Sequence, residues 1–310
     1  MLKKKLEEQA PGTIKTFYYG EPSIAIPVIS IKGRSSGQTL LITAGIHGSE
    51  YPGIEAAIRL KQRIKPEELS GNLIILPCVN QSAFFERSVF VHPIDRKNLN
   101  RCFPGNRNGT ESEQLAYVLE KDFFPTADFY LDFHSGDLPE QLDKFVFIPG
   151  IGEAEVKKAA RKAAEYLDLP FGVLSESRNG AYNHACLLGL PSLLIERGGC
   201  GERAESAING FLEDAYQVLR YLKILNDQKV FPSKLALLKD IHYLTSVYDG
   251  LWTPAFSVGD TVNQGEIVGV IEDFFANVVK EYTATKDGKI IYQLVGLPVS
   301  QGEILVAYGC

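Results

Sequence analysis

The sequence is poor in the features that mark several large classes of protein. Its five cysteines are scattered, odd in number and without a CxxC pair. That usage argues against a disulfide framework and a cysteine-type zinc site, and favours free thiols in a reducing cytoplasm. No stretch approaches the roughly 18 apolar residues that a membrane helix needs, and no apolar run follows the basic start at residues 1–8. We therefore expect a cytoplasmic protein without a membrane partner.

The sequence also lacks a cluster of positive charge. Its 32 lysines and arginines are outnumbered by 38 acidic residues, which gives a formal charge of -6. Because phosphate binding needs a concentrated positive field, a nucleic-acid partner is disfavoured. The composition is otherwise globular, with 45% hydrophobic and 23% charged residues, and this excludes a disordered chain, a collagen-like fibre and a coiled coil.

Apolar patterns with strand and helix spacing alternate over the first two thirds of the chain. Such alternation predicts an α/β fold with a mixed sheet flanked by helices. A capping box, Thr110-x-x-Glu113, marks the start of one of these helices. The expected strands are residues 40–46, 72–79, 129–133, 145–148 and 192–196, and the other expected helices are residues 53–64, 153–167 and 202–225.

Residues 231–310 form a second expected domain, after a first domain of residues 1–230 that contains the motifs described below. Short β-like runs separated by turn signals predict a small all-β unit. It resembles biotinyl/lipoyl-type modules, but the expected hairpin tip, Asp273 to Asn277, has no lysine to carry a group. We therefore reject a carrier role. We expect the module either to roof an active-site entrance or to pack in a homo-oligomer.

Three motifs that follow three of the predicted strands carry the chemistry. His47 and Glu50 follow the first strand, and His134 ends another. Two imidazoles and a carboxylate suit one Zn²⁺ ion and leave a fourth position for water. A fourth segment contains Asn100 and Arg101, a pair that binds a carboxylate through the guanidinium fork and the amide.

These motifs together resemble the succinylglutamate desuccinylase/aspartoacylase family, a branch of the zinc carboxypeptidase-like hydrolases. The matching segments are ITAGIHGSE at 42–50, NLNRCFPG at 98–105, DFHSG at 132–136 and SLLIERGG at 192–199. The resemblance implies that His47, Glu50 and His134 are zinc ligands and that Asn100 and Arg101 bind a substrate carboxylate. It also implies that Glu196 is the catalytic carboxylate and Tyr182 a substrate contact.

The sequence departs from the aspartoacylase pattern at two arginines. Pro93 occupies the place of an arginine that polarises the scissile carbonyl, and Arg87 and Arg96 are the candidates to replace it. Cys186 occupies the place of a further substrate-binding arginine. Recognition of a dicarboxylic substrate is therefore disfavoured relative to a different N-acyl amino acid or a neutral amide.

The leading hypothesis is a zinc-dependent deacylase that hydrolyses the amide of a small N-acyl amino acid, with Glu196 moving the proton. The alternatives are a metallocarboxypeptidase-like peptidase and a non-catalytic zinc-binding protein of the same fold. At single positions other interpretations stay open. Glu196 is either catalytic or paired with Arg197 at the surface, and Asp132 either orients a ligand or caps a backbone amide. His92 and His242 are expected to be ordinary surface or loop residues, and His184 a packed one.

Overall fold

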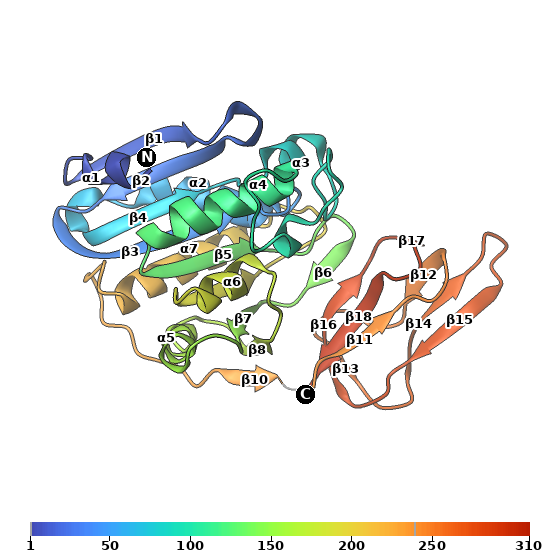
Figure 1. Ribbon diagram of the computed structural model, residues 1–310. Coiled ribbons are helices and arrows are strands. Elements are labelled where there is room, and N and C mark those ends of the chain that lie inside the picture. The colour runs from blue at the N-terminus through green and yellow to red at the C-terminus, as the bar shows by residue number, and fades with distance from the viewer. Residues whose placement is uncertain (1, 239) are drawn as a thin grey trace.

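A nine-stranded mixed sheet forms the larger part of the molecule in the computed structural model, which describes residues 2–238 and 240–310 (Figure 1). The strand order is β1-β2-β4-β3-β5-β9-β7-β8-β10. The strands are β1 (Thr13–Tyr19), β2 (Ile26–Lys32), β3 (Ser35–Ala44), β4 (Ser70–Leu76), β5 (Phe129–His134), β7 (Phe145–Pro149), β8 (Phe171–Ser175), β9 (Ser192–Glu196) and β10 (Ala236–Leu238). The central strands β4, β3, β5 and β9 are parallel to one another, whereas β1–β2, β2–β4 and β7–β9 are antiparallel.

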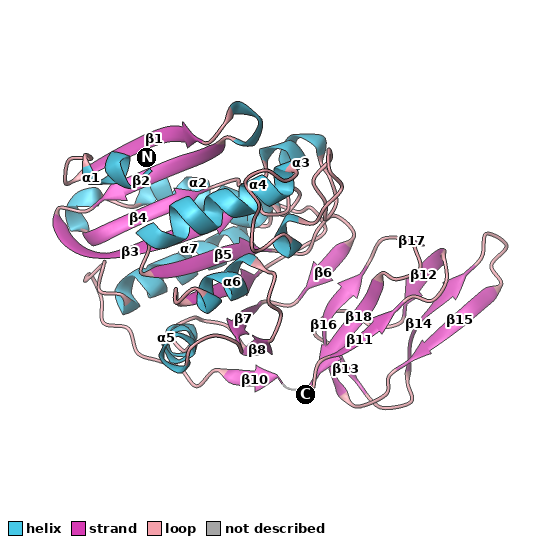
Figure 2. Ribbon diagram, in the orientation of Figure 1, coloured by secondary structure: helices cyan, strands magenta, loops and turns pink. Residues whose placement is uncertain are grey.

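Helices cover both faces of this sheet (Figure 2). One face packs against α2 (Tyr51–Arg63), α5 (Ala154–Ala164) and α7 (Glu205–Tyr221), and the other against α1 (Leu2–Glu7), α4 (Glu111–Val118) and α6 (Ala181–Leu187). A short helix, α3 (Gln81–Glu86), follows β4. Side chains of β5 alternate between the two cores, with Phe133 toward α7 and Tyr130 toward α6. The α/β prediction with a mixed sheet flanked by helices is therefore confirmed.

The predicted capping box is present at the start of α4. The Thr110 backbone N–H donates to Glu113 Oε2 over 2.8 Å. The expected helices 153–167 and 202–225 are shorter in the structure, as α5 and α7. The sequence patterns did not predict the β1–β2 hairpin or β8. Strand β1 has no buried residue, and β8 becomes exposed toward its carboxyl end, so neither gives a continuous apolar run.

The C-terminal region is an antiparallel β structure of two sheets. One has the order β11-β18-β16-β13, and the other β15-β14-β12-β17. A core around Trp252, Ile271 and Tyr308 lies between them. The strands are β11 (His242–Thr245), β12 (Gly250–Pro254), β13 (Thr261–Val262), β14 (Ile267–Glu272), β15 (Val278–Thr283), β16 (Gly288–Leu294), β17 (Pro298–Val299) and β18 (Ile304–Gly309). The boundary expected near residue 230 stays a prediction, since β10 extends the large sheet to Leu238.

The α/β unit and the C-terminal β region are joined by one strand, β6. Strand β6 (Glu140–Leu142) leaves the large α/β unit and pairs with β16, with Leu142 opposite Tyr292 and Glu140 opposite Leu294. An apolar cluster that includes Phe145, Phe171 and Ile291 packs across the same boundary. The C-terminal region is thereby held against the carboxyl end of the central strands.

The expected hairpin tip does not cover the large sheet. Phe274 and Phe275, between β14 and β15, are 88% and 86% exposed. That end of the module points away from the α/β unit (Figure 1). This exposure counts against a roofing role for the tip. The homo-oligomer alternative stays a prediction.

No helix among residues 2–238 and 240–310 is long and apolar enough to cross a membrane.

The loop after β9 is anchored by a buried ion pair. Arg197 Nε and Nη2 donate to the two carboxylate oxygens of Asp214, on α7, over 2.6 and 2.9 Å. Both residues are buried, at 7% and 1% exposure. The alternative that Glu196 pairs with Arg197 at the surface is therefore wrong, because Arg197 is committed to Asp214.

Removing Asp214 should destabilise the protein strongly. We expect Asp214→Ala to lower the free energy of unfolding by about 3–5 kcal/mol, because it leaves the Arg197 guanidinium buried without its partner. Urea unfolding measures this value. Glu213→Ala is the control, since the Glu213 contact with Arg220 is half-exposed and should contribute about 0–1 kcal/mol. Equal effects of the two substitutions would contradict the prediction.

Candidate metal centre and active-site cavity

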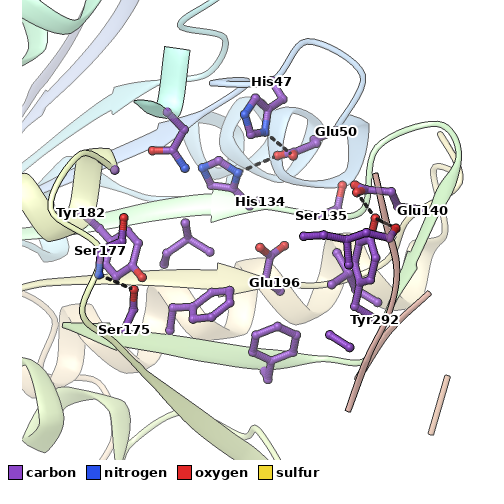
Figure 3. Close-up of a pocket in the computed structure, with 18 of the residues that line it drawn as sticks. His47, Glu50, His134, Ser135, Glu140, Ser175, Ser177, Tyr182, Glu196 and Tyr292 are labelled. Carbon is purple, nitrogen blue, oxygen red and sulfur yellow. Dashed lines mark hydrogen bonds and ion pairs between the residues drawn. The ribbon is translucent and has the colours of Figure 1, made fainter. Parts of the chain in front are cut away.

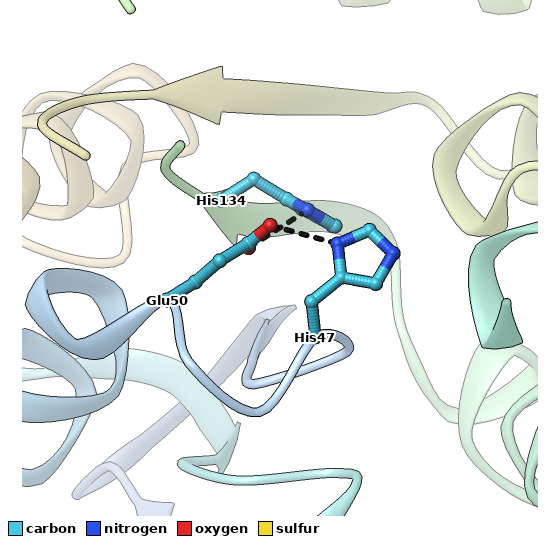
Figure 4. A group of neighbouring side chains, drawn as sticks. All are labelled: His47, Glu50 and His134. Carbon is cyan, nitrogen blue, oxygen red and sulfur yellow. Dashed lines mark hydrogen bonds and ion pairs between the residues drawn. The ribbon is translucent and has the colours of Figure 1, made fainter. Parts of the chain in front are cut away.

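The candidate metal ligands meet at the carboxyl ends of β3 and β5 (Figure 4). His47 lies in the loop after β3, Glu50 directly precedes α2, and His134 is the last residue of β5. The loop is tightly packed: a Cβ at Gly48 would lie 2.2 Å from the Ala83 backbone of α3. Glycine there lets the loop that carries His47 pack directly against α3.

The two imidazoles point their Nδ1 atoms at one carboxylate. His47 Nδ1 lies 2.7 Å from Glu50 Oε1, and His134 Nδ1 lies 3.0 Å from Glu50 Oε2. The ring centroids are 5.1 Å apart, and one ligand atom from each of the three residues lies within 4.8 Å of the others. The structure thus brings together the three residues that the sequence predicted as ligands.

The other nitrogen of each ring faces an oxygen acceptor. His47 Nε2 donates to Asn98 Oδ1 over 3.0 Å, and His134 Nε2 lies 3.1 Å from Asp132 Oδ2. Asp132 is itself held by the hydroxyl of Thr43, which donates to its Oδ1 over 2.6 Å. With Nε2 of each ring facing an oxygen acceptor, the Nδ1 atoms are the nitrogens directed at the position where Glu50 and a metal ion would meet. For Asp132 this geometry favours the ligand-orienting alternative.

The donor set fits a metal ion. Glu50 Oε2 is buried and makes no hydrogen bond within the described part of the chain, as expected for an oxygen that binds a cation instead. Burial raises the pKa of Glu50, but the two imidazoles outweigh it and lower this pKa to about 2. Glu50 is therefore ionised at neutral pH. Two imidazole nitrogens and one carboxylate oxygen are a ligand set found in catalytic zinc sites.

Glu196 faces this cluster from the neighbouring strand. It ends β9, directly opposite His134 in the parallel ladder, and its carboxylate points into the cavity below the cluster (Figure 3). Glu196 is 8% exposed. Burial, together with the carboxylates of Glu50 and Glu140, raises the pKa of Glu196 well above its ordinary value despite the opposing effect of His134. Its environment therefore favours accepting a proton.

The predicted substrate-binding residues line the same cavity from the α6 side. Arg101 is exposed and Tyr182 buried, and both line it. Asn100 is buried, and its Oδ1 accepts from the backbone N–H of Ala181 at the start of α6 over 2.8 Å. The Asn100 amide oxygen is thus engaged in holding α6, which leaves its NH₂ group as the donor for a ligand.

The cavity has a volume of about 380 Å³ and is bordered on one side by the C-terminal region. Its apolar wall includes Phe145, Phe147 and Leu194 of the large sheet. From the C-terminal strands and their flanks come Tyr243, Ile291, Tyr292, Ile304 and Ala307. The module covers the cavity with these residues of its near sheet rather than with the hairpin tip.

Several residues considered as candidates from the sequence do not line this cavity. Neither Arg87 nor Arg96 lines the cavity, so neither takes the place of the arginine lost at Pro93. Cys186 is buried, and its thiol contacts the Ile151 carbonyl. His92 lies in a loop as expected but is buried, 3.3 Å from Glu111.

The remaining two histidines lie outside the candidate metal cluster. His184 packs near Phe103 and faces Glu120, as expected. His242 stacks on Tyr308 within the C-terminal region.

Sequence reasoning missed several residues of the site. The Asn98 contact to His47 spans 51 positions, and the Glu140 contact to Tyr292 spans 152. Asn98 lay inside a recognised motif, which was the available signal for it. Glu140 had none, because only the pairing of β6 with β16 brings it to the cavity wall.

Fold and site together define a family of hydrolases. The chain belongs to the succinylglutamate desuccinylase/aspartoacylase family, whose catalytic-domain model matches residues 36–222, more than half of its length. The resemblance seen in the sequence motifs is thereby confirmed.

Particular relatives extend the likeness over nearly the whole chain. An N-alpha-acetyl-L-2,4-diaminobutyric acid deacetylase from Halomonas elongata is 28% identical over 295 residues, covering 91% of this chain and 85% of that protein. A solved succinylglutamate desuccinylase from Silicibacter sp. TM1040 shares 27% identity with a TM-score of 0.83, covering 95% of this chain and 92% of that one. The product-bound ectoine utilization protein of Ruegeria pomeroyi shares the fold at 24% identity and a TM-score of 0.85, covering 97% and 99%.

Removing the carboxylate behind His134 should weaken metal binding. We expect Asp132→Ala to lower the affinity for Zn²⁺ by about 10–100-fold, because the imidazole loses the acceptor that holds its ring. Competition titration against a chelator measures this affinity. Asp128→Ala is the matched control, since Asp128 binds Thr39 N–H at the opposite end of β5. Unchanged affinity in Asp132→Ala would remove Asp132 from the metal centre.

Metal affinity should also fall as the pH falls. Burial lowers the pKa of both ligand histidines, but the Glu50 carboxylate outweighs it, so the pKa of His47 is raised and that of His134 raised well above the ordinary value. Without metal the rings therefore keep their protons to a higher pH than ordinary histidines, and these protons compete with the ion. Isotherms between about pH 6 and pH 8 should show affinity rising with pH. A flat profile would contradict this.

Proposed function

We propose that the protein is a zinc-dependent deacylase that hydrolyses the amide bond of a small N-acyl amino acid. One observation carries the proposal: the His47–Glu50–His134 cluster and the buried Glu196 carboxylate line the same cavity as Arg101. Family membership supports an amide-bond hydrolase, and the Halomonas relative is a deacetylase of an N-acetyl amino acid.

In this proposal each group has a defined task. His47, Glu50 and His134 hold one zinc ion, which when bound polarises the scissile carbonyl and acidifies water. Glu196 accepts a proton from the attacking water and returns it to the departing amine. Arg101 and the Asn100 NH₂ group bind the amino-acid carboxylate, with Tyr182 beside them, and so fix the amide above Glu196. The walls of the C-terminal region limit access of bulk water.

The charges of the cavity favour an amino acid without a second carboxylate. Among the described residues that line it, Arg101 is the sole arginine or lysine, and the first carboxylate of the substrate occupies it. An uncharged or cationic side chain is therefore favoured over an acidic one. The 2,4-diaminobutyrate of the Halomonas relative's substrate fits that requirement.

The alternatives are less well supported. A peptidase needs a groove that accommodates a chain, whereas this cavity of about 380 Å³ is at the small end of the range for small-molecule pockets. A non-catalytic zinc-binding protein has no need for a buried carboxylate opposite the ligands. We also infer a cytoplasmic location, which the five free cysteines favour.

Metal analysis joined to a substrate screen tests the proposal. We expect one Zn²⁺ per chain and release of free amine from N-acetyl derivatives of diaminobutyrate, ornithine and neutral amino acids, with less from N-acetylaspartate. Faster release from short peptides than from all N-acetyl amino acids would favour the peptidase alternative. Stoichiometric zinc without hydrolysis of any substrate would favour the binding protein.

Glu196→Gln separates catalysis from metal binding. We expect kcat to fall on the order of a hundred-fold or more, because glutamine cannot accept the proton, while the zinc content stays unchanged. Steady-state kinetics and metal analysis on the same preparation measure both. Glu202→Gln, an exposed exchange shortly after the same motif, is the control. Full activity of Glu196→Gln would remove that residue from the mechanism.

A further inference from the structure

Glu140 is a carboxylate held rigidly in the wall of the cavity. Tyr292 OH donates to its Oε1 over 2.6 Å, and the backbone N–H of Asp137 donates to its Oε2 over 2.9 Å. Its own carbonyl accepts from Cys200 N–H over 2.7 Å. A Cβ at Gly199 would lie only 2.3 Å from that carbonyl oxygen, so the neighbouring chain is in close contact. The Glu140 side chain therefore has little freedom to leave the cavity.

Glu140 lies at the end of the cavity away from the proposed carboxylate-binding group. Tyr182, Ser175 and Ser177 lie on one side of Glu196, and Glu140 and Tyr292 on the other (Figure 3). Asn100 belongs to the Tyr182 end, because it binds the N-terminus of α6. A substrate whose amino-acid carboxylate occupies the Asn100–Arg101 end and whose amide lies above Glu196 therefore extends its acyl group toward Glu140.

No cation balances this acyl end. Within the described part of the chain, Arg101 is the single lysine or arginine of the lining, and it serves the other end. Lys289, the nearest basic residue along β16, pairs with Asp143 and does not line the cavity. Both Glu140 oxygens are already hydrogen-bonded, so a second carboxylate would find neither a positive charge nor a free donor there.

We propose that Glu140 sets acyl specificity by excluding acyl groups that carry a carboxylate, which makes the protein a deacylase for acetyl and other uncharged acyl groups and not a desuccinylase. This inference rests on the proposed deacylase function. Burial raises the pKa of Glu140 to about 7, so its carboxylate is charged mainly above that pH, where it repels a second carboxylate brought into the partly desolvated cavity. The β6–β16 pairing places Glu140 in this position, so the C-terminal region takes part in acyl selection.

Three substrates that share one amino acid separate charge from size. These are N-acetyl-, N-succinyl- and N-succinamoyl-2,4-diaminobutyrate, of which the last two have nearly the same length and differ in the terminal charge. At pH 8, where Glu140 is mostly ionised, we expect kcat/KM for the succinamoyl substrate to exceed that for the succinyl substrate by about ten-fold, because the succinyl substrate binds only when Glu140 takes up a proton. For Glu140→Gln we expect this ratio to fall to about one through a gain on the succinyl substrate.

Tyr292→Phe is the second variant. It removes the hydroxyl whose hydrogen bond favours the charged form of Glu140, so we expect the succinamoyl preference to weaken at pH 8 and to return at higher pH. A purely structural role of Glu140 would lower turnover of all three substrates together and leave the ratio unchanged, and this would overturn the proposal. Melting temperatures of both variants check folding, and if Glu140→Gln does not fold, the native ratio alone decides.

The native enzyme distinguishes the remaining outcomes. Equal use of the succinyl and succinamoyl substrates, or equal rejection of both, would overturn the proposal, because size and not charge would then decide. Failure to hydrolyse all three substrates, the acetyl one included, would refute the proposed deacylase function itself.

Discussion

The parallel pairing of β3, β5 and β9 is the constraint on which the rest of the site depends. Because these strands run side by side in the same direction, their carboxyl ends lie at one edge of the sheet. The loop with His47, the terminal His134 and the terminal Glu196 therefore come together although long stretches of sequence separate them. Side chains alternate between the two faces along a strand, so Asp132 and His134, two residues apart on β5, point to the same face. This places Asp132 next to the imidazole of His134.

At this edge of the sheet, each imidazole nitrogen of His47 and His134 faces a different polar group. Asn98 and Asp132 face the Nε2 atoms, and Glu50 faces the Nδ1 atoms. A buried carboxylate between two imidazoles stays ionised, whereas Glu196, one strand away, is poised to take up a proton. The pKa values of these two buried glutamates are thus shifted in opposite directions, because their neighbours differ.

The C-terminal region completes the cavity instead of standing apart from it. Strand β6 leaves the α/β unit to join the C-terminal sheet, and residues of β16 and β18 return to form the cavity wall. The residues that β6 and β16 contribute to the wall are thus separate from the candidate ligands, which lie after β3 and at the end of β5. Pro93 and Cys186, the positions where the sequence resemblance implies arginines, do not line the cavity.

The sequence by itself determined the local features. Buried strands such as 192–196 and the capping box at Thr110 could be recognised because their signals lie within a few residues. The candidate ligands could be recognised because they lie in two motifs that resemble those of a known family. Only the tertiary structure decided that Arg197 pairs with Asp214 instead of Glu196, that Asn98 contacts His47, and that Glu140 lines the cavity. Each of these depends on contacts between distant segments, which hydrophobic periodicity and local spacing do not encode, since they arise only when strands pair and helices dock.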